Sequence, residues 1–418
     1  MTIPFDILSN ISEILSYEHD IKTLRSLSLC SQALVPLCQR HLFHTICVPN
    51  TSGRTFTLID RGRYLDRFHK ALSSSPQIGT YVRHLHYFVD HNDREFGMAS
   101  SILKRLTQVK AFKIEYRAHE DPRLFISWKR LSENRRLASA ITSIIKQPTP
   151  CSLSIVNISS FPPSILASIT SPLLDLDIRF LDVDKSGNIN EALAVGWSQV
   201  EGVLPCLSSL EIRDSKDSAT TVIALAGKLF DFSRIESVVV EWDDEEPVGA
   251  AKALLKLTPA LKDLRVQVNT DINNCGGIAD CILQGAHQKL TTLKLDLGGR
   301  RHDLGGSIPI GPFAGVVAEL AMISGCCDAL ETIAVMLRYV NRDSWLSIDW
   351  APFDNVITSK SFPRLRVLTI EMVFIWLEDL VNRALLERET EAGCVRQLWR
   401  IRDIPGLDFR CTARIERC

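Results

Sequence analysis

The chain has 418 residues, of which 45% are hydrophobic and 23% are charged. This composition is typical of folded domains, which excludes extensive disorder and leaves room for two or three ordinary domains or one elongated repeat array. The formal net charge is only -1, so the chain has no global positive field that would gather nucleic acid or an anionic membrane.

Targeting signals are absent from the pattern of the sequence. Residues 1–6 contain an acid and no basic cluster before an apolar run, unlike a signal peptide. No later apolar stretch reaches the roughly 18 residues that a membrane span needs. The twelve cysteines are scattered and include no CxxC pair, which favours free thiols in a reducing compartment. We therefore expect an intracellular protein, cytoplasmic, nuclear or both.

The first 48 residues predict three short helices. Residues 4–15 place Ile7, Leu8 and Ile11 on one apolar stripe, and Asp20 can cap a second helix. A third apolar set follows at Leu34, Leu37, Leu42 and Ile46. Three short helices bury too little surface to be very stable alone. Such a unit either docks on another protein or caps the array that follows, and the pattern leaves both possibilities open.

Residues 3–8 (Ile-Pro-Phe-Asp-Ile-Leu) resemble the Leu-Pro-x-Glu-Leu-Leu opening of the F-box, and residues 41–46 (His-Leu-Phe-His-Thr-Ile) resemble its close in fungal, mushroom-type F-box proteins. The segment from 61 to 85 is similar to their bridge to a first repeat. Two departures are Cys30-Ser31 in place of the usual Val-Cys pair and Leu34 in place of the usual Trp.

The resemblance implies a substrate-recognition subunit of an SCF-type cullin–RING ubiquitin ligase, with the F-box binding a Skp-family adaptor. The docking residues that it implies are Pro4, Ile7, Leu8, Ile11, Leu34 and Leu37. An alternative is a protein-interaction scaffold with a degenerate F-box and no role in a ligase.

A repeated pattern, apolar-x-x-apolar-x-apolar, dominates the chain after residue 80. Clear copies begin at Leu207, Leu261, Leu290, Leu330 and Leu365. Each copy alternates at period two, as a strand with one buried face does, and segments of helical composition separate the copies. Strand and helix in alternation predict parallel strands.

The expected fold is therefore α/β, with a short three-helix F-box followed by an irregular leucine-rich-repeat solenoid, a horseshoe of parallel strands with outer helices. A doubly wound sheet is the alternative. The expected boundaries are 1–48 for the F-box-like motif, 49–81 for a helical linker, 82–401 for the solenoid and 402–418 for a C-terminal tail. Strand residues that point out of the core would line the concave face and bind a protein target, and they are His84, His86, Asp175, Asp177, Glu211, Arg213, Asp263, Arg265, Lys294 and Asp296.

Several motifs suggest other chemistry and do not complete it. The calcium-loop-like run from Asp182 to Asn190 has Leu193 where a bidentate Glu is needed. The glycine-rich run 298–307 contains no Lys for a phosphate loop, and the acidic run 241–246 is typical of a solvated loop. No nucleophile–base constellation stands out. We expect no enzymatic activity, no cofactor, no metal, and no nucleic-acid or membrane partner.

Overall fold

The structure is a computed structural model. It describes residues 5–18, 20–49, 57–89, 97–116, 126–169, 175–179, 182–183, 207–213, 230–242, 253–268, 277–285, 288–298, 311–339, 349–359, 362–376 and 383–417. The chain forms two compact units, Met1–Pro205 and Cys206–Cys418.

The first unit opens with the three helices that the sequence predicts. They are α1 (Phe5–Tyr17), α2 (Ile21–Cys30) and α3 (Val35–Leu42), with a 3-10 turn η1 (Gln32–Leu34) before the third. Asp20 caps α2 as expected, because its carboxylate accepts the backbone N–H of Thr23 at 3.0 Å. The helix boundaries therefore follow local capping and apolar periodicity.

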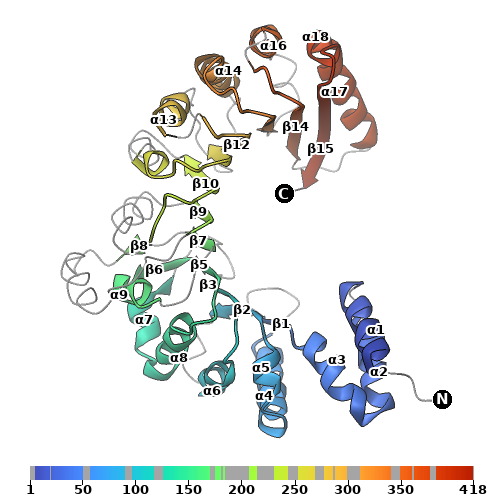
Figure 1. The fold of residues 1–418 in the computed structure, drawn as a ribbon, viewed down its shortest axis with the longest axis vertical. Coiled ribbons are helices and arrows are strands. Elements are labelled where there is room, and N and C mark those ends of the chain that lie inside the picture. The colour runs from blue at the N-terminus through green and yellow to red at the C-terminus, as the bar shows by residue number, and fades with distance from the viewer. Residues whose placement is uncertain are drawn as a thin grey trace. The chain divides into compact units, whose positions relative to one another are not determined.

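A parallel sheet fills the rest of the first unit. Its strands, in spatial order, are β1 (Thr45–Val48), β2 (His84–Val89), β3 (Ala111–Tyr116), β5 (Ser152–Val156) and β7 (Asp175–Arg179). In Figure 1 the connecting helices of this unit lie on one side of the strands, namely α4 (Leu58–Ser74), α5 (Ile78–Tyr81), α6 (Gly97–Arg105) and α8 (Arg135–Ile145).

A small second sheet decorates this unit. Its strands are β4 (Ile126–Ser127), β6 (Ile158–Phe161) and β8 (Asp182–Val183), and the short helices α7 (Trp128–Ser132) and α9 (Pro163–Ala167) accompany them. The rings of Trp128 and Phe161 pack in a T-shaped arrangement with their centroids 4.8 Å apart. Its three strands follow β3, β5 and β7 along the chain, one after each strand of the main sheet.

The second unit repeats the same architecture with longer strands. These are β9 (Ser209–Arg213), β10 (Ser237–Trp242), β11 (Asp263–Val268), β12 (Thr292–Gly298), β13 (Thr332–Tyr339), β14 (Val367–Trp376) and β15 (Asp408–Arg417), all parallel and in chain order. The helices are α13 (Ile278–Gly285), α14 (Gly311–Ile323), α16 (Ala351–Thr358), α17 (Arg383–Gln397) and α18 (Trp399–Arg402).

Two expected boundaries are wrong at the ends of the array. Residues 45–48, assigned to the helical motif, form β1, whose Ile46 and Val48 are buried beside β2. Residues 402–418, assigned to a tail, contain β15, which pairs with β14 along its whole length. Both segments alternate in polarity, and each completes its sheet because a neighbouring strand supplies backbone partners.

The alternating apolar residues form continuous buried rows. In the second unit Leu210, Val238, Leu264 and Leu293 are neighbours in register and are almost fully buried. Within each unit the strands follow one another in chain order, and the helices lie on one face of the sheet (Figure 1). A doubly wound sheet instead reverses its strand order and has helices on both faces. Each unit is thus a leucine-rich-repeat solenoid of α/β class.

Candidate functional site

The three N-terminal helices share a very small core. Leu24, Leu34 and Cys38 are its buried residues. Partly buried side chains pack around them, namely Leu8, Leu15, Leu27, Leu37 and Leu42. The expectation that Leu34 lies on a docking face is wrong, since this residue is only 7% exposed. The η1 turn contacts both α2 and α3 and so holds Leu34 inside the core.

An apolar stripe on α1 remains open to solvent. Ile7, Ile11 and Ile14 are 49%, 39% and 56% exposed, and their i, i+4, i+7 spacing places them on one face of the helix. Tyr17 continues the exposed surface at the end of α1. A contiguous exposed apolar stripe indicates an interaction surface, whereas isolated exposed apolar residues do not. Ile7 and Ile11 are therefore open to solvent, whereas Leu8 and Leu37 lie mainly against the core. Pro4 falls outside the described residues.

We call the face of each sheet opposite its helices the open face. In the first unit His84 and Asp175 are exposed on this face, and His86 and Asp177 are half-buried beside them along their strands. Asp177 accepts the hydroxyl of Ser154 at 2.7 Å. Strands β3 and β5 separate the two histidines from the two aspartates. The four predicted residues thus share a face without forming one cluster.

A charged group on this face is not among the residues predicted from the sequence. The Glu115 carboxylate is buried and accepts contacts from His86 Nε2 at 3.0 Å and from Lys113 Nζ at 2.8 Å. Nearby, the ring of His44 lies 4.9 Å from that of His84. Burial, followed by the charge of His84, lowers the pKa of His44 below its ordinary value. This end of the open face is therefore polar and densely packed.

The open face of the second unit is the stronger charged surface. Arg265 and Lys294 are neighbours in register on β11 and β12, and Asp263 is exposed at the start of β11. Glu211 is half-buried on β9, which β10 separates from β11. The side chain of Arg213 lies outside the described residues. The structure therefore brings four of the six residues predicted in this unit close together, namely Asp263, Arg265, Lys294 and Asp296.

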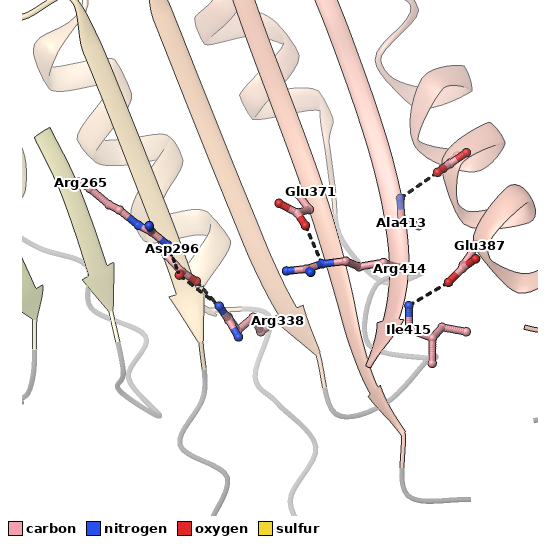
Figure 2. Close-up of polar contacts among 9 residues, drawn as sticks. Arg265, Asp296, Arg338, Glu371, Glu387, Ala413, Arg414 and Ile415 are labelled. Atoms are coloured by element: carbon pink, nitrogen blue, oxygen red, sulfur yellow. Dashed lines mark hydrogen bonds and ion pairs between the residues drawn. The ribbon is translucent and has the colours of Figure 1, made fainter. Parts of the chain in front are cut away.

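Asp296 does not behave as predicted. It lies on the open face, but its side chain is only 4% exposed. Arg265 Nη2 approaches one carboxylate oxygen at 3.3 Å, and Arg338 Nε approaches the other at 3.1 Å (Figure 2). The two guanidinium groups cover the carboxylate, so Asp296 organises this surface and is not itself available to a target.

Other charged residues of this face are missing from the predicted set. Arg338 on β13 is one, and Glu371 on β14 is another, 2.6 Å from Arg414 Nε on β15. Arg410 precedes Arg414 on the same strand, beyond the expected end of the solenoid. The period-two alternation of these strands is a usable signal, because each of these residues alternates with the inward-facing positions of its strand.

The other motifs do not add a site. Residues 184–190, 299–310 and 243–246 lie outside the described residues. Within the described ranges, no group of three or more His, Cys, Asp or Glu side chains is arranged to hold a metal ion. In the same ranges, every helix is too short or too polar to cross a membrane.

No protein-family model matches the chain, and no curated protein matches it. Among solved structures it is similar to the leucine-rich repeat-containing protein LegL7 from Legionella pneumophila, with 13% identity and a TM-score of 0.41 over 81% of this chain and 96% of that one. It is also similar to a chain of the Rad7 and Elc1 complex in yeast, with 12% identity and a TM-score of 0.39 over 88% of this chain and 83% of that one. Similarity at this level concerns the path of the backbone and does not extend to partners or activity.

Proposed function

We propose that the chain is the substrate-recognition subunit of an SCF-type cullin–RING ubiquitin ligase. The observation that carries the proposal is the exposed stripe of Ile7, Ile11 and Ile14 on α1, in a unit that resembles an F-box in sequence. A three-helix unit with so small a core gains stability from docking on a larger partner. A Skp-family adaptor is the partner that the F-box resemblance implies.

Burial of the stripe would contribute to the free energy of binding to the adaptor. Each isoleucine is about half-exposed, and full burial of such a side chain contributes about 1.5–3 kcal/mol. Covering the exposed parts of all three therefore contributes about 2–4 kcal/mol, before the cost of association. The docking face in this proposal consists of Ile7, Ile11 and Ile14, with Leu8 and Leu37 supporting it from below.

The open faces of the sheets would hold the target. Their exposed charged side chains of both signs, among them Asp263, Arg265 and Lys294, suit a polar protein surface. The chain itself would do no chemistry. It would raise the effective concentration of the target beside the ubiquitin-loaded enzyme.

The docking test is co-purification of a Skp-family adaptor with the full chain. We expect the double variant Ile7→Asp and Ile11→Asp to lose the adaptor, because docking would bury carboxylates without partners. Ser9→Asp combined with Ser16→Asp is the matched control, since both serines are partly exposed and lie on the side of α1 opposite Ile7. Equal adaptor recovery from the double variant and the control would refute this docking face.

The second candidate is a scaffold that binds a partner without recruiting a ligase. The observation in its favour is Leu34, which stands where the F-box usually has Trp. Because Leu34 is buried in the core of the three helices, the smaller side chain reduces the volume that holds this unit together. Absence of adaptor from the wild-type pull-down, with another protein recovered, would favour the scaffold.

A further inference from the structure

Two cations are held side by side on the open face of the second unit. Arg265 and Lys294 are Cα partners in the pairing of β11 with β12, and both occupy positions between buried residues of their strands. Like charges directly opposite each other on one face of a sheet repel. Lys294 makes no ion pair with any described residue to offset this repulsion. Asp296 offsets part of this repulsion by pairing with Arg265, and an anion lying over both cations would offset the rest.

Asp296 holds the neighbouring arginines in place. Its buried carboxylate contacts Arg265 and Arg338, whose side chains remain 37% and 29% exposed. With Lys294, these residues place three cations around one buried carboxylate on three adjacent strands. Arg265 uses Nη2 for Asp296, and the described residues leave its Nε and Nη1 unengaged. The group therefore presents a preorganised positive surface, since fixed donors lose little freedom on binding.

The strand beside these cations carries uncharged side chains on the open face. Ala334 is the register neighbour of Lys294 on β13, and Met336 is the register neighbour of Asp296. Both side chains are half-buried, and a small and a flexible apolar residue let an extended chain approach the sheet. Acidic residues bound the surface on either side, with Asp263 at the start of β11 and Glu371 on β14. Glu371 is the register neighbour of Met336 and pairs with Arg414. A short segment over the cations therefore suits this surface better than a long polyanion, which would cross both acids.

We propose that the surface formed by Arg265, Lys294 and Arg338, with Ala334 and Met336 between them, binds a short acidic peptide segment through its Asp or Glu carboxylates. This inference deepens the target-binding role and rests on the proposed function. It names the chemistry of the target, carboxylates on an extended protein segment, and the place where they bind. Planar guanidinium groups suit carboxylates geometrically.

The test is a fluorescence-anisotropy titration of the purified full chain with a short labelled peptide of alternating Glu and Ser. We expect saturable binding that weakens as salt rises from about 50 to 200 mM. Lys294→Glu should weaken binding by about tenfold or more. The same variant should melt no lower than wild type, because the exchange replaces a like-charge pair with an opposite-charge pair. Lys256→Glu, an equal charge change at an exposed helix position, should leave binding unchanged.

Further titrations with other ligands test the alternatives to carboxylate binding. A Gln–Ser peptide should not bind, and equal binding would overturn the role of charge. Tighter binding of a phosphoserine peptide would overturn the assignment to carboxylates, and tighter binding of a single-stranded DNA oligonucleotide would overturn the assignment to a protein segment. Binding of the Glu–Ser peptide that Lys294→Glu leaves intact would overturn the location. No adaptor or ligase is present in this titration, so its failure is distinct from loss of adaptor docking.

Discussion

Replacing Asp296 by Asn should destabilise the second unit more than removing a half-exposed charge from the same open face. The carboxylate accepts Arg265 Nη2 at 3.3 Å and, from Arg338, Nε at 3.1 Å and Nη2 at 3.3 Å (Figure 2). Asn keeps the shape and one acceptor oxygen but removes the charge between two guanidinium groups. The two guanidinium groups then face each other across β12 without the carboxylate charge that lies between them.

The size of this loss in unfolding free energy depends on how far the partner arginines are buried. A hydrogen bond to a charged group contributes about 1.5–3 kcal/mol, and Asp296 accepts three. The arginine side chains are about one-third exposed, so they can turn toward water and recover much of this. We expect a loss of about 2–3 kcal/mol in the free energy of unfolding. Glu371→Gln breaks a contact with Arg414 that is more exposed, and it should cost below about 1 kcal/mol.

Amide hydrogen exchange read by mass spectrometry measures this locally. Peptides covering β12 and β13 should exchange about 30- to 150-fold faster in Asp296→Asn than in wild type, since each 1.4 kcal/mol of opening free energy is about tenfold. Glu371→Gln is the control and should change the rates less than about fivefold. The effect of Asp296→Asn should persist at about 1 M salt, because buried pairs are screened little.

Two results would refute this reasoning. Rates in Asp296→Asn no faster than those in Glu371→Gln would mean that the buried carboxylate does not hold the arginines. A difference that disappears at high salt would mean that solvent reaches the group freely. Either result would also remove the preorganisation on which the acidic-segment surface depends.

Two further predictions concern packing and pH. Gly79→Ala should destabilise the first unit, because a Cβ at this position would overlap the carbonyl oxygen of Arg105. Gly62→Ala, in open space on α4, should stabilise this unit by about 0.5–1 kcal/mol. Urea unfolding of both variants checks the sign, and equal effects would contradict the close approach of α5 to the end of α6. Burial raises the pKa of Glu319 above its ordinary value of 4.5 although the backbone N–H groups of Gly277 and Ala279 donate to it. The folded state therefore binds this proton more tightly, and the stabilisation is full below the unfolded pKa and is lost as pH rises through the folded pKa. The difference in unfolding free energy between wild type and Glu319→Gln should shrink as pH rises from about 4.5 to 7, and a constant or growing difference in urea titrations would contradict this sign.

The buried rows of the second unit follow from the spacing of apolar residues along the chain. Period-two spacing predicts that Leu264, Val266, Leu293 and Leu295 face the core, and all four are almost fully buried. This prediction succeeds because successive side chains of a strand alternate between faces whatever the neighbours are. The same argument correctly places Arg265 and Lys294 on the opposite face.

Strand β15 shows where the pattern is too weak to read. Its inward positions include Cys411 and Ala413, which are small, and the apolar-x-x-apolar-x-apolar run 404–409 ends where the strand begins. The strand is completed by distant partners. Glu391 and Glu387 of α17 accept the backbone N–H groups of Ala413 and Ile415 at 2.9 Å each, along the edge that β14 does not cover (Figure 2). Edge backbone groups need such partners, and a sequence pattern does not show which residues supply them.

Local sequence therefore sets which face of its strand each side chain takes, and tertiary packing decides what is exposed on that face. Asp296 lies opposite the core as its spacing predicts, but Arg338, 42 residues later in the chain, arrives on the next strand and helps cover it. Leu34 is predicted as a docking residue, and the η1 turn between α2 and α3 buries it. The physical reason is the range of the two effects. Alternation is a property of neighbouring backbone dihedrals, whereas exposure depends on side chains brought from other strands and helices.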